Sequence, residues 1–265
     1  MNRIDRLFQE QKGEILSVYI TAGYPQLNDT LPILVSLQQQ GVQMVEIGMP
    51  FSDPLADGAV IQESSQRALE NGMKLELLFR QLENVRKHIH IPLVLMGYLN
   101  PVLQMGMEQF LEKCQKSGID GLIIPDLPPA EYEEKYQKLF LKRGIHNVLL
   151  VTPHTEESRI RWISELSGGF LYLVADAATT GARRSIGDHQ KEYFQRIQHM
   201  DLPLPGLIGF GISSRSTFLT ACKYASGAII GSAFIRALGE QGKLSLEQKV
   251  EKFIGEIRGE SGINS

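Results

Sequence analysis

The sequence predicts an α/β protein folded as a closed (β/α)8 barrel, the TIM barrel, and three observations support that fold class. Eight short apolar runs follow one another along the chain, and a segment with helical periodicity comes after each of them. Continuous apolar runs of this kind are typical of parallel strands that are covered on both faces. The length of 265 residues is close to the ~250 residues that such a barrel needs. We therefore expect a single domain over residues 1–265.

The predicted strands and helices alternate without a long linker. The apolar runs predict strands over residues 15–21, 44–48, 92–97, 121–124, 147–151, 170–174, 207–210 and 228–231. The helical segments that follow them cover 28–40, 59–87, 108–117, 129–143, 155–167, 188–199, 214–224 and the stretch up to about residue 260. The alternative is a doubly wound open sheet, but eight units fit it less well, and no GxGxxG follows the first strand.

Two segments indicate helices beyond the eight of the basic barrel. The stretch 59–87 after strand 2 is long enough for an additional helix. The N-terminal sequence MNRIDRLFQEQKGE is charged and amphipathic, which indicates a helix that covers the bottom of the barrel. The N-terminus also lacks the continuous apolar core of a signal peptide.

Composition and charge exclude several classes of function. The chain is 43% hydrophobic and 22% charged, with a formal net charge of −3, so nothing favours nucleic acid or an anionic membrane as a partner. No apolar run approaches the roughly 18 to 20 residues of a membrane span. Cys114 and Cys222 stand far apart without a CxxC motif, which indicates reduced thiols and a cytoplasmic protein. The six histidines show no ligand spacing, so we predict no metal site.

Two carboxylates mark the region after strand 2 as the place of chemistry. Glu46 interrupts a buried apolar strand, where a carboxylate costs several kcal/mol unless it is paired or functionally perturbed. Asp57 lies eleven residues on, after a turn rich in Pro and Gly. Barrel active sites lie at the C-terminal ends of the strands, so the two acids can divide acid and base roles there. The structural alternatives are a buried ion pair for Glu46 and a helix cap or turn for Asp57.

Glycine-rich turns after the late strands indicate an anion site. Gly209 to Ser213 read GFGIS at the end of the seventh strand, and Gly231-Ser232-Ala233 end the eighth strand at a helix start. Backbone N–H groups can approach a phosphate closely at such positions. Thr180-Gly181, after the sixth strand, is placed to close a third side. Tyr172, in the sixth strand, points its hydroxyl into the barrel mouth or is a core aromatic residue.

Six stretches of the chain carry a specific family resemblance. They are YITAGYP at 19–25, EIGMPFSDPLADGAVIQ at 46–62, GYLNP at 97–101, PDLP at 125–128, GFGIS at 209–213 and GSA at 231–233. Over nearly its whole length the chain resembles the tryptophan synthase alpha subunit family. The resemblance implies cleavage of indole-3-glycerol phosphate to indole and glyceraldehyde 3-phosphate, a retro-aldol reaction that needs neither metal nor cofactor.

The resemblance also implies roles for individual residues. Glu46 would be the general acid and base, and Asp57 would bind the indole N–H and stabilise the cationic intermediate. Tyr172 would assist near the substrate hydroxyls, and Thr180 would orient Asp57. The remaining positions divide between the indole pocket, with Tyr98, Ile61 and Phe210, and the phosphate site, with Gly181, Gly211, Gly231 and Ser232.

The family's partner is a beta subunit that carries pyridoxal phosphate and receives indole through a tunnel in an αββα heterotetramer. The loops after strands 2 to 4, including Asp53 and residues 126–128, would face that subunit. The chain departs from the family pattern after strand 6, where Asp176 stands in place of a basic residue and Ala178 in place of a glycine. Ala59 stands where proline is usual.

Two other functions are weighed against the alpha-subunit lyase. The first is another cofactor-free phosphate-binding barrel, such as an indoleglycerol-phosphate synthase or a phosphoribosylanthranilate isomerase. Those families lack the EIGxPFSDPLADG run, and a synthase would need a lysine in the first strand, which residues 15–21 do not contain. The second is a subunit that mainly binds and activates its partner and has lost its own chemistry. Asp176 and Ala178 support it, and the presence of Glu46, Asp57 and Thr180 opposes it.

Overall fold

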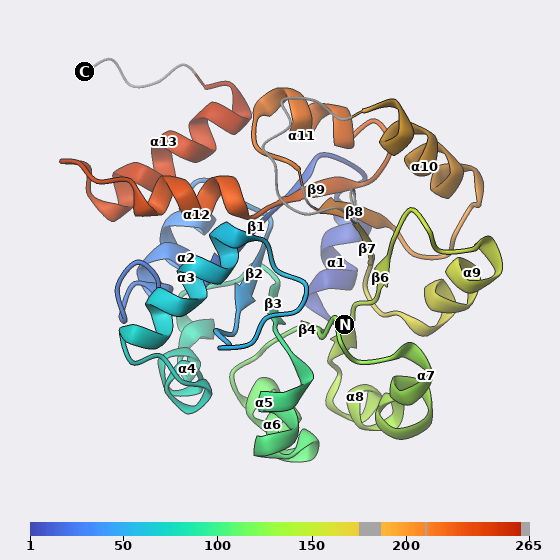
Figure 1. The fold of residues 1–265 in the computed structure, drawn as a ribbon, viewed down its shortest axis with the longest axis horizontal. Coiled ribbons are helices and arrows are strands. Elements are labelled where there is room, and N and C mark those ends of the chain that lie inside the picture. Colours follow the sequence, from blue (N-terminus) through green and yellow to red (C-terminus); the bar gives the residue numbers. More distant parts are fainter. Residues whose placement is uncertain (175–186, 210, 261–265) are drawn as a thin grey trace.

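A computed structural model describes residues 1–174, 187–209 and 211–260. All the strands of the sheet run parallel, in the order β5-β4-β3-β2-β1-β9-β8-β7-β6. The strands are β1 Ile15–Thr21, β2 Met44–Gly48, β3 Leu93–Met96, β4 Gly121–Ile123, β5 His146–Asn147, β6 Leu150–Val151, β7 Leu171–Val174, β8 Gly206–Gly209 and β9 Gly227–Ile230. Helices surround this sheet, so the architecture is a (β/α)8 barrel (Figure 1).

The predicted fifth strand, 147–151, is divided into β5 and β6. β5 pairs with β4, and β6 pairs with β7. Between them, the Val148 N–H donates to the Leu122 carbonyl at 2.8 Å, and the Leu149 carbonyl accepts from the Tyr172 N–H at 3.0 Å. One continuous segment therefore bonds to both neighbours with a stagger, and this stagger closes the barrel. As a result, β7, β8 and β9 are the sixth, seventh and eighth barrel strands.

The helices form the outer layer of the barrel. Those of the first half are α1 Arg3–Glu10, α2 Thr30–Gln39, α3 Ala59–Glu70, α4 Leu75–Leu82, the 3-10 turn η1 Val85–Lys87, α5 Leu99–Met105 and α6 Met107–Lys116. Those of the second half are α7 Pro129–Glu131, the π-helical turn η2 Tyr132–Tyr136, α8 Gln137–Arg143, α9 Glu157–Leu166, α10 Asp188–His199, α11 Arg215–Ala221, α12 Ser232–Gly239 and α13 Leu246–Arg258. No helix in the described part of the chain has the length and apolar character needed to cross a membrane.

Two helices lie between β2 and β3, and two more lie between β3 and β4. The second pair was not predicted, because α5 begins in what the sequence indicates as a loop. Asn100 and Pro101 stand in its first turn, where proline is tolerated because the N–H of that position has no helical partner. Gly106, at φ +89°, then separates α5 from α6.

The hydrophobic core has two layers on the two sides of the strands. The larger layer lies between the strands and the helices. The smaller layer fills the inside of the barrel, with Ile15, Met44, Val94, Phe170 and Ile229 among its members. Because side chains alternate between the two faces of a strand, this inner layer identifies which residues point into the barrel.

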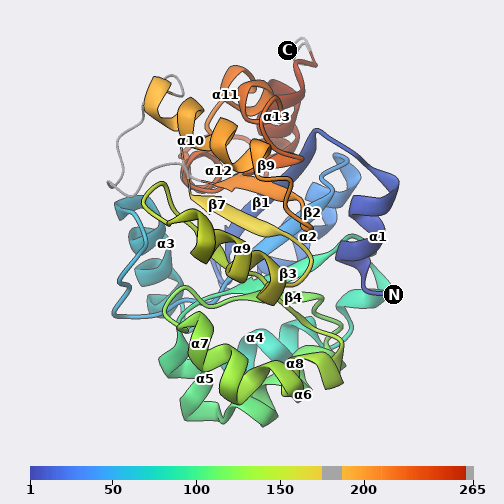
Figure 2. The same ribbon diagram turned by 90° about the vertical axis from the view of Figure 1, so that its right-hand side faces the viewer.

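Helix α1 closes one end of the inner layer. Its fully buried Ile4 packs among the inner residues, and the Asn2 side chain accepts from the Ile4 N–H at the start of the helix. Figure 2 shows α1 at one end of the barrel and α3 at the other. The end with α3 is the end where β2 finishes, so it is the C-terminal end of the strands, where barrel enzymes place their chemistry.

Candidate active site

Glu46 is the central residue of the site. It is the third residue of β2 and lies beside Tyr19 of β1 and Val94 of β3. Met44, two residues earlier, belongs to the inner layer, so Glu46 also points into the barrel. Its side chain is fully buried. Among the described residues it forms no salt bridge, which rules out the buried ion pair considered from the sequence.

The surroundings of Glu46 favour its protonated form. The Ser17 hydroxyl donates to Glu46 Oε1 at 3.3 Å, and Oε2 has no hydrogen-bond partner in the part of the chain that the structure describes. Burial raises the pKa of the Glu46 carboxyl from 4.5 to about 8, and the Ser17 hydrogen bond opposes that rise. A carboxyl group whose pKa lies near neutrality can both give and accept a proton at physiological pH.

Asp57 is held by a tyrosine, and it does not cap a helix. Gly58 occupies the N-cap position of α3, one residue after Asp57. The Tyr98 hydroxyl donates to Asp57 Oδ2 at 2.9 Å and accepts from the Ala56 N–H at 3.0 Å. Burial raises the pKa of Asp57, and the hydrogen bond from Tyr98 opposes this rise. Tyr98 thus fixes both the loop and its carboxylate.

The sequence predicts that Tyr98 contacts indole. The structure adds a second feature of this residue, its hydrogen bonds to the loop after β2. The Tyr98 side chain is only 4% exposed, and its ring centroid lies 5.5 Å from that of Phe51. Its position at the N-cap of α5, just after β3, places it beside the loop that follows the neighbouring strand β2. No sequence signal links positions 98 and 57, because the contact depends on the path of two loops.

Two more tyrosines close around the carboxylates. The hydroxyl of Tyr19 lies over Gly48, and the hydroxyl of Tyr172 lies over Gly209, so a Cβ at either glycine would overlap the phenol. Burial raises the pKa of Tyr172, and the charges of Glu46 and Asp57 raise it further. Burial likewise raises the pKa of Tyr19, and the charges of the same two carboxylates raise it further. Together with Tyr98, five titratable groups therefore meet at the C-terminal end of the barrel.

Ile61 covers this group of residues from α3. It is 8% exposed and packs in a small cluster with Tyr19 and Ile235. Ile61 thus lies at the mouth of the barrel, which is where an apolar ring of a substrate would enter. Ile61 was predicted as a site residue from the family resemblance and not from a pattern in the sequence itself.

The late glycines provide backbone donors at the same end of the barrel. Gly211 has φ +76°, a conformation that favours glycine, and it is exposed. Gly231 is the N-cap of α12, and Ser232 is the first residue of that helix. The first amides of α12 have no partner within the helix, and the helix dipole favours an anion there. Thr180, Gly181 and Phe210, also predicted as site residues, lie outside the described residues.

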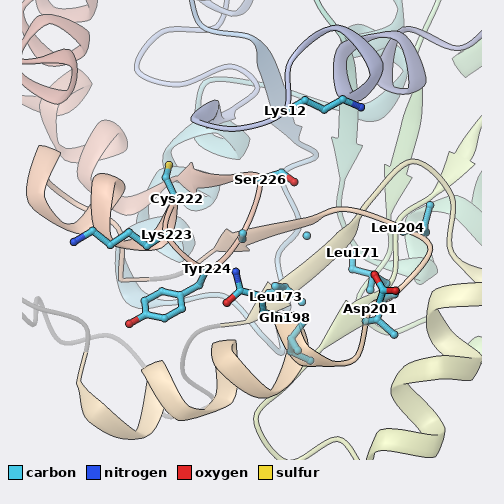
Figure 3. A pocket seen from close by; sticks show the side chains of 14 residues that line it. Lys12, Leu171, Leu173, Gln198, Asp201, Leu204, Cys222, Lys223, Tyr224 and Ser226 are labelled. Atoms are coloured by element: carbon cyan, nitrogen blue, oxygen red, sulfur yellow. The ribbon is translucent and has the colours of Figure 1, made fainter.

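A separate cavity lies at the opposite end of the strands. It has a volume of about 290 Å³ and is lined in part by Leu171, Gly206 and Ser226, which begin or precede β7, β8 and β9 (Figure 3). Lys12 and Lys223 at its edge point away from one another (Figure 3). Because it lies at the N-terminal ends of the strands, this cavity does not belong to the site around Glu46.

The described residues contain no group of three or more His, Cys, Asp or Glu side chains placed to hold a metal ion. Cys114 and Cys222 are both free. The groups that are placed for chemistry are therefore carboxylates, hydroxyls and backbone amides. They suit proton transfer next to a bound anion.

Comparison with known proteins identifies the family. The family model for the tryptophan synthase alpha chain matches residues 6–261. The chain belongs to the tryptophan synthase alpha chain family. The alpha chain of Flavobacterium johnsoniae is 53% identical over 97% of this chain and 100% of its own length. The alpha chain of Flavobacterium psychrophilum is 54% identical over the same shares of the two chains.

Solved structures of the family have the same fold. The alpha chain from Legionella pneumophila superposes with a TM-score of 0.88 at 30% identity, over 98% of this chain and 97% of that one. The tryptophan synthase complex from Pyrococcus furiosus matches with a TM-score of 0.84 at 33% identity, over 94% and 99% of the two chains. As a member of the tryptophan synthase alpha chain family, the chain is a carbon–carbon lyase that cleaves indole-3-glycerol phosphate to indole and glyceraldehyde 3-phosphate.

Proposed function

We propose that Glu46 and Asp57 carry out this cleavage, with Glu46 as the general acid and base. The observation that supports this most directly is the state of the Glu46 carboxyl: it is fully buried, its pKa is raised to about 8, and Oε2 has no partner within the described ranges. Such a group is costly to fold and useful for proton transfer near neutral pH.

The reaction needs two proton transfers, and one carboxyl can perform both. Protonated Glu46 gives its proton to C3 of the indole ring, which produces a cationic indolenine. The resulting carboxylate then takes the proton of the hydroxyl on the adjacent side-chain carbon. The C–C bond breaks, its electron pair returns to the ring, and indole and the aldehyde form. Glu46 ends as it began, so the cycle consumes no other reactant.

Asp57 is suited to stabilise the cationic intermediate. When ionised, its carboxylate accepts the indole N–H and offsets the positive charge that develops on the ring. Tyr98 holds Asp57 Oδ2 at 2.9 Å, which fixes the carboxylate before the substrate arrives. Burial around Asp57 strengthens this charge interaction because the local dielectric is low.

The remaining predicted residues fit the rest of the substrate. Tyr172 lies near the two carboxylates and would contact the hydroxyls of the glycerol chain. Ile61, Tyr98 and Phe210 would contact the indole ring. Gly181, Gly211, Gly231 and Ser232 would bind the phosphate, supported by the free amides at the start of α12. Thr180 would orient Asp57.

The chain assembles with a tryptophan synthase beta subunit, in the αββα heterotetramer expected for the family. Structures of tryptophan synthase from Pyrococcus furiosus and Mycobacterium tuberculosis support this partnership. Pyridoxal phosphate belongs to the beta subunit, and we propose that the alpha chain needs no cofactor of its own. The exposed loop with Leu55, which is 83% accessible, is a contact we assign to that subunit. The free cysteines fit a cytoplasmic enzyme.

The test is indole release from indole-3-glycerol phosphate by Glu46→Gln, with and without the beta subunit. Gln keeps the shape of the side chain but cannot give or take the proton, so we expect turnover to fall by at least about a thousandfold. The variant should still fold and should still bind glycerol phosphate. Turnover equal to that of the wild-type chain would overturn the assignment.

A further inference from the structure

Ser17 is a polar residue in an otherwise apolar part of the inner barrel wall. It is fully buried in β1, two residues before Tyr19, so both side chains point into the barrel. Its neighbours in the adjacent strands are Met44 and Ile229, both members of the inner apolar layer. A buried hydroxyl in such a place is unfavourable unless it has a hydrogen-bond partner.

The hydrogen bond that Ser17 forms with a side chain is the bond to Glu46. The hydroxyl donates to Oε1 at 3.3 Å, and both side chains are fully buried. Because Ser17 contacts only one of the two carboxyl oxygens, it makes them inequivalent. Oε1 is engaged with the barrel wall, whereas Oε2 has no hydrogen-bond partner among the described residues.

We propose that Ser17 is a positioning residue for the cleavage reaction, which holds Oε1 of Glu46 so that Oε2 is the oxygen that exchanges the proton with the substrate. The proposal rests on the role of Glu46 proposed above. When Glu46 is protonated, Oε1 is the carbonyl oxygen that accepts from Ser17, and the proton lies on Oε2. After proton donation, the same contact holds the carboxylate in place for the second transfer.

The hydrogen bond also influences when Glu46 loses its proton. A donor to a carboxylate favours its charged form, so Ser17 opposes the effect of burial on the pKa of Glu46. The other titratable groups around Glu46 are Tyr19 from β1, Tyr172 from β7 and Asp57 from the loop after β2. Burial raises the pKa of both tyrosines, so they stay neutral while Glu46 titrates.

The experiment compares Ser17→Ala with the wild-type chain over a range of pH. Loss of the donor should move the alkaline limb of kcat/KM upward by about half to one pH unit, because protonated Glu46 then persists to higher pH. At the optimum, kcat should fall about three- to tenfold, because the carboxyl is less well oriented. KM should stay nearly constant, since Ser17 does not touch the substrate.

Two further variants separate this role from a general effect on packing. Ser17→Cys keeps the volume but donates weakly, so its alkaline limb should lie between those of the wild-type chain and Ser17→Ala. Ser164→Ala removes another buried hydroxyl, from α9, and should leave the alkaline limb unchanged. An alkaline limb that is the same in Ser17→Ala as in the wild-type chain would overturn the proposal.

The Glu46→Gln variant distinguishes the two proposals. If it retains full turnover, the catalytic role of Glu46 fails, and the role of Ser17 fails with it. If Glu46→Gln is inactive but both Ser17 variants keep the wild-type alkaline limb, only the positioning role fails.

Discussion

Each end of the barrel contains a buried carboxylate, and the two differ in how many hydrogen-bond and ion-pair partners surround them. Asp120, at the end closed by α1, is 3% exposed and accepts from Arg3 at 3.0 Å, from Arg86 at 2.5 Å and from the Leu93 N–H at 2.9 Å. Glu46, at the other end, is also buried, but among the described residues only the Ser17 hydroxyl donates to it.

This difference separates a structural acid from a chemical one. Asp120 is paired with both arginines and fastens α1 and η1 to the start of β4. Glu46 has no cationic partner among the described residues, so its carboxyl can hold a proton near neutral pH, as the proposed role requires. Burial alone therefore does not separate the acid that we propose for catalysis from the structural one; the two differ in how well their hydrogen bonds are satisfied.

Asp120→Ala should have the largest effect on stability. It leaves the half-buried guanidinium of Arg86 without its carboxylate partner, so we expect the free energy of unfolding to fall by about 3 kcal/mol. Urea unfolding measures this directly. Turnover at low temperature should remain close to that of the wild-type chain. Asp188→Ala removes the exposed ion pair with Lys191 and should change stability little. If the two substitutions lowered the free energy of unfolding equally, Asp120 would not be the structural acid described above.

Glu46→Gln should change how the free energy of unfolding depends on pH. The folded chain keeps the Glu46 proton up to a pKa of about 8, whereas the unfolded chain loses it near 4.5. Between these values the folded state binds more protons, so rising pH destabilises it, by on the order of a few kcal/mol.

Glu46→Gln abolishes this titration, so the variant should gain stability relative to the wild-type chain as pH rises from 5 to 9. Urea unfolding at three pH values measures the gain. A constant difference between the two chains across that range would contradict a raised pKa for Glu46.

Tyr98→Phe should have the smallest effect of the three. It removes the donor to Asp57 Oδ2 and the acceptor of the Ala56 N–H but keeps the contact with Phe51. We expect kcat to fall about tenfold and the free energy of unfolding to fall by about 1 kcal/mol. Steady-state kinetics and urea unfolding measure both. Tyr136→Phe, on the outside of the barrel, is the matched control. Equal kinetics of the two variants would show that Asp57 needs no support from Tyr98.

The sequence predicts the framework of the site because that framework depends on local patterns. The apolar runs locate β1 and β2 residue by residue, and Glu46 is conspicuous because it interrupts one of them. The division of the fifth strand into β5 and β6 was not predicted, because it results from barrel closure and not from local preference. Helix α5 was missed because Asn100 and Pro101 resemble a loop.

The contacts that tune the site depend on distances between segments far apart in the chain. Tyr98 reaches Asp57 across 41 positions, and Ser17 reaches Glu46 across 29. The sequence contains one signal for the second pair, a serine two residues before Tyr19 in an apolar strand. That signal becomes useful only when the register between β1 and β2 is known.

The most direct test of the central claim is a titration of the Glu46 carboxyl by carbon-13 NMR, with the signal assigned by its loss in Glu46→Gln. We expect a midpoint near 8, which is the pKa to which burial raises this group. The midpoint should also coincide with the alkaline limb of kcat/KM. A midpoint near 4.5, the ordinary value for glutamate, would show that Glu46 is ionised in the resting enzyme and would contradict its role as the initial proton donor.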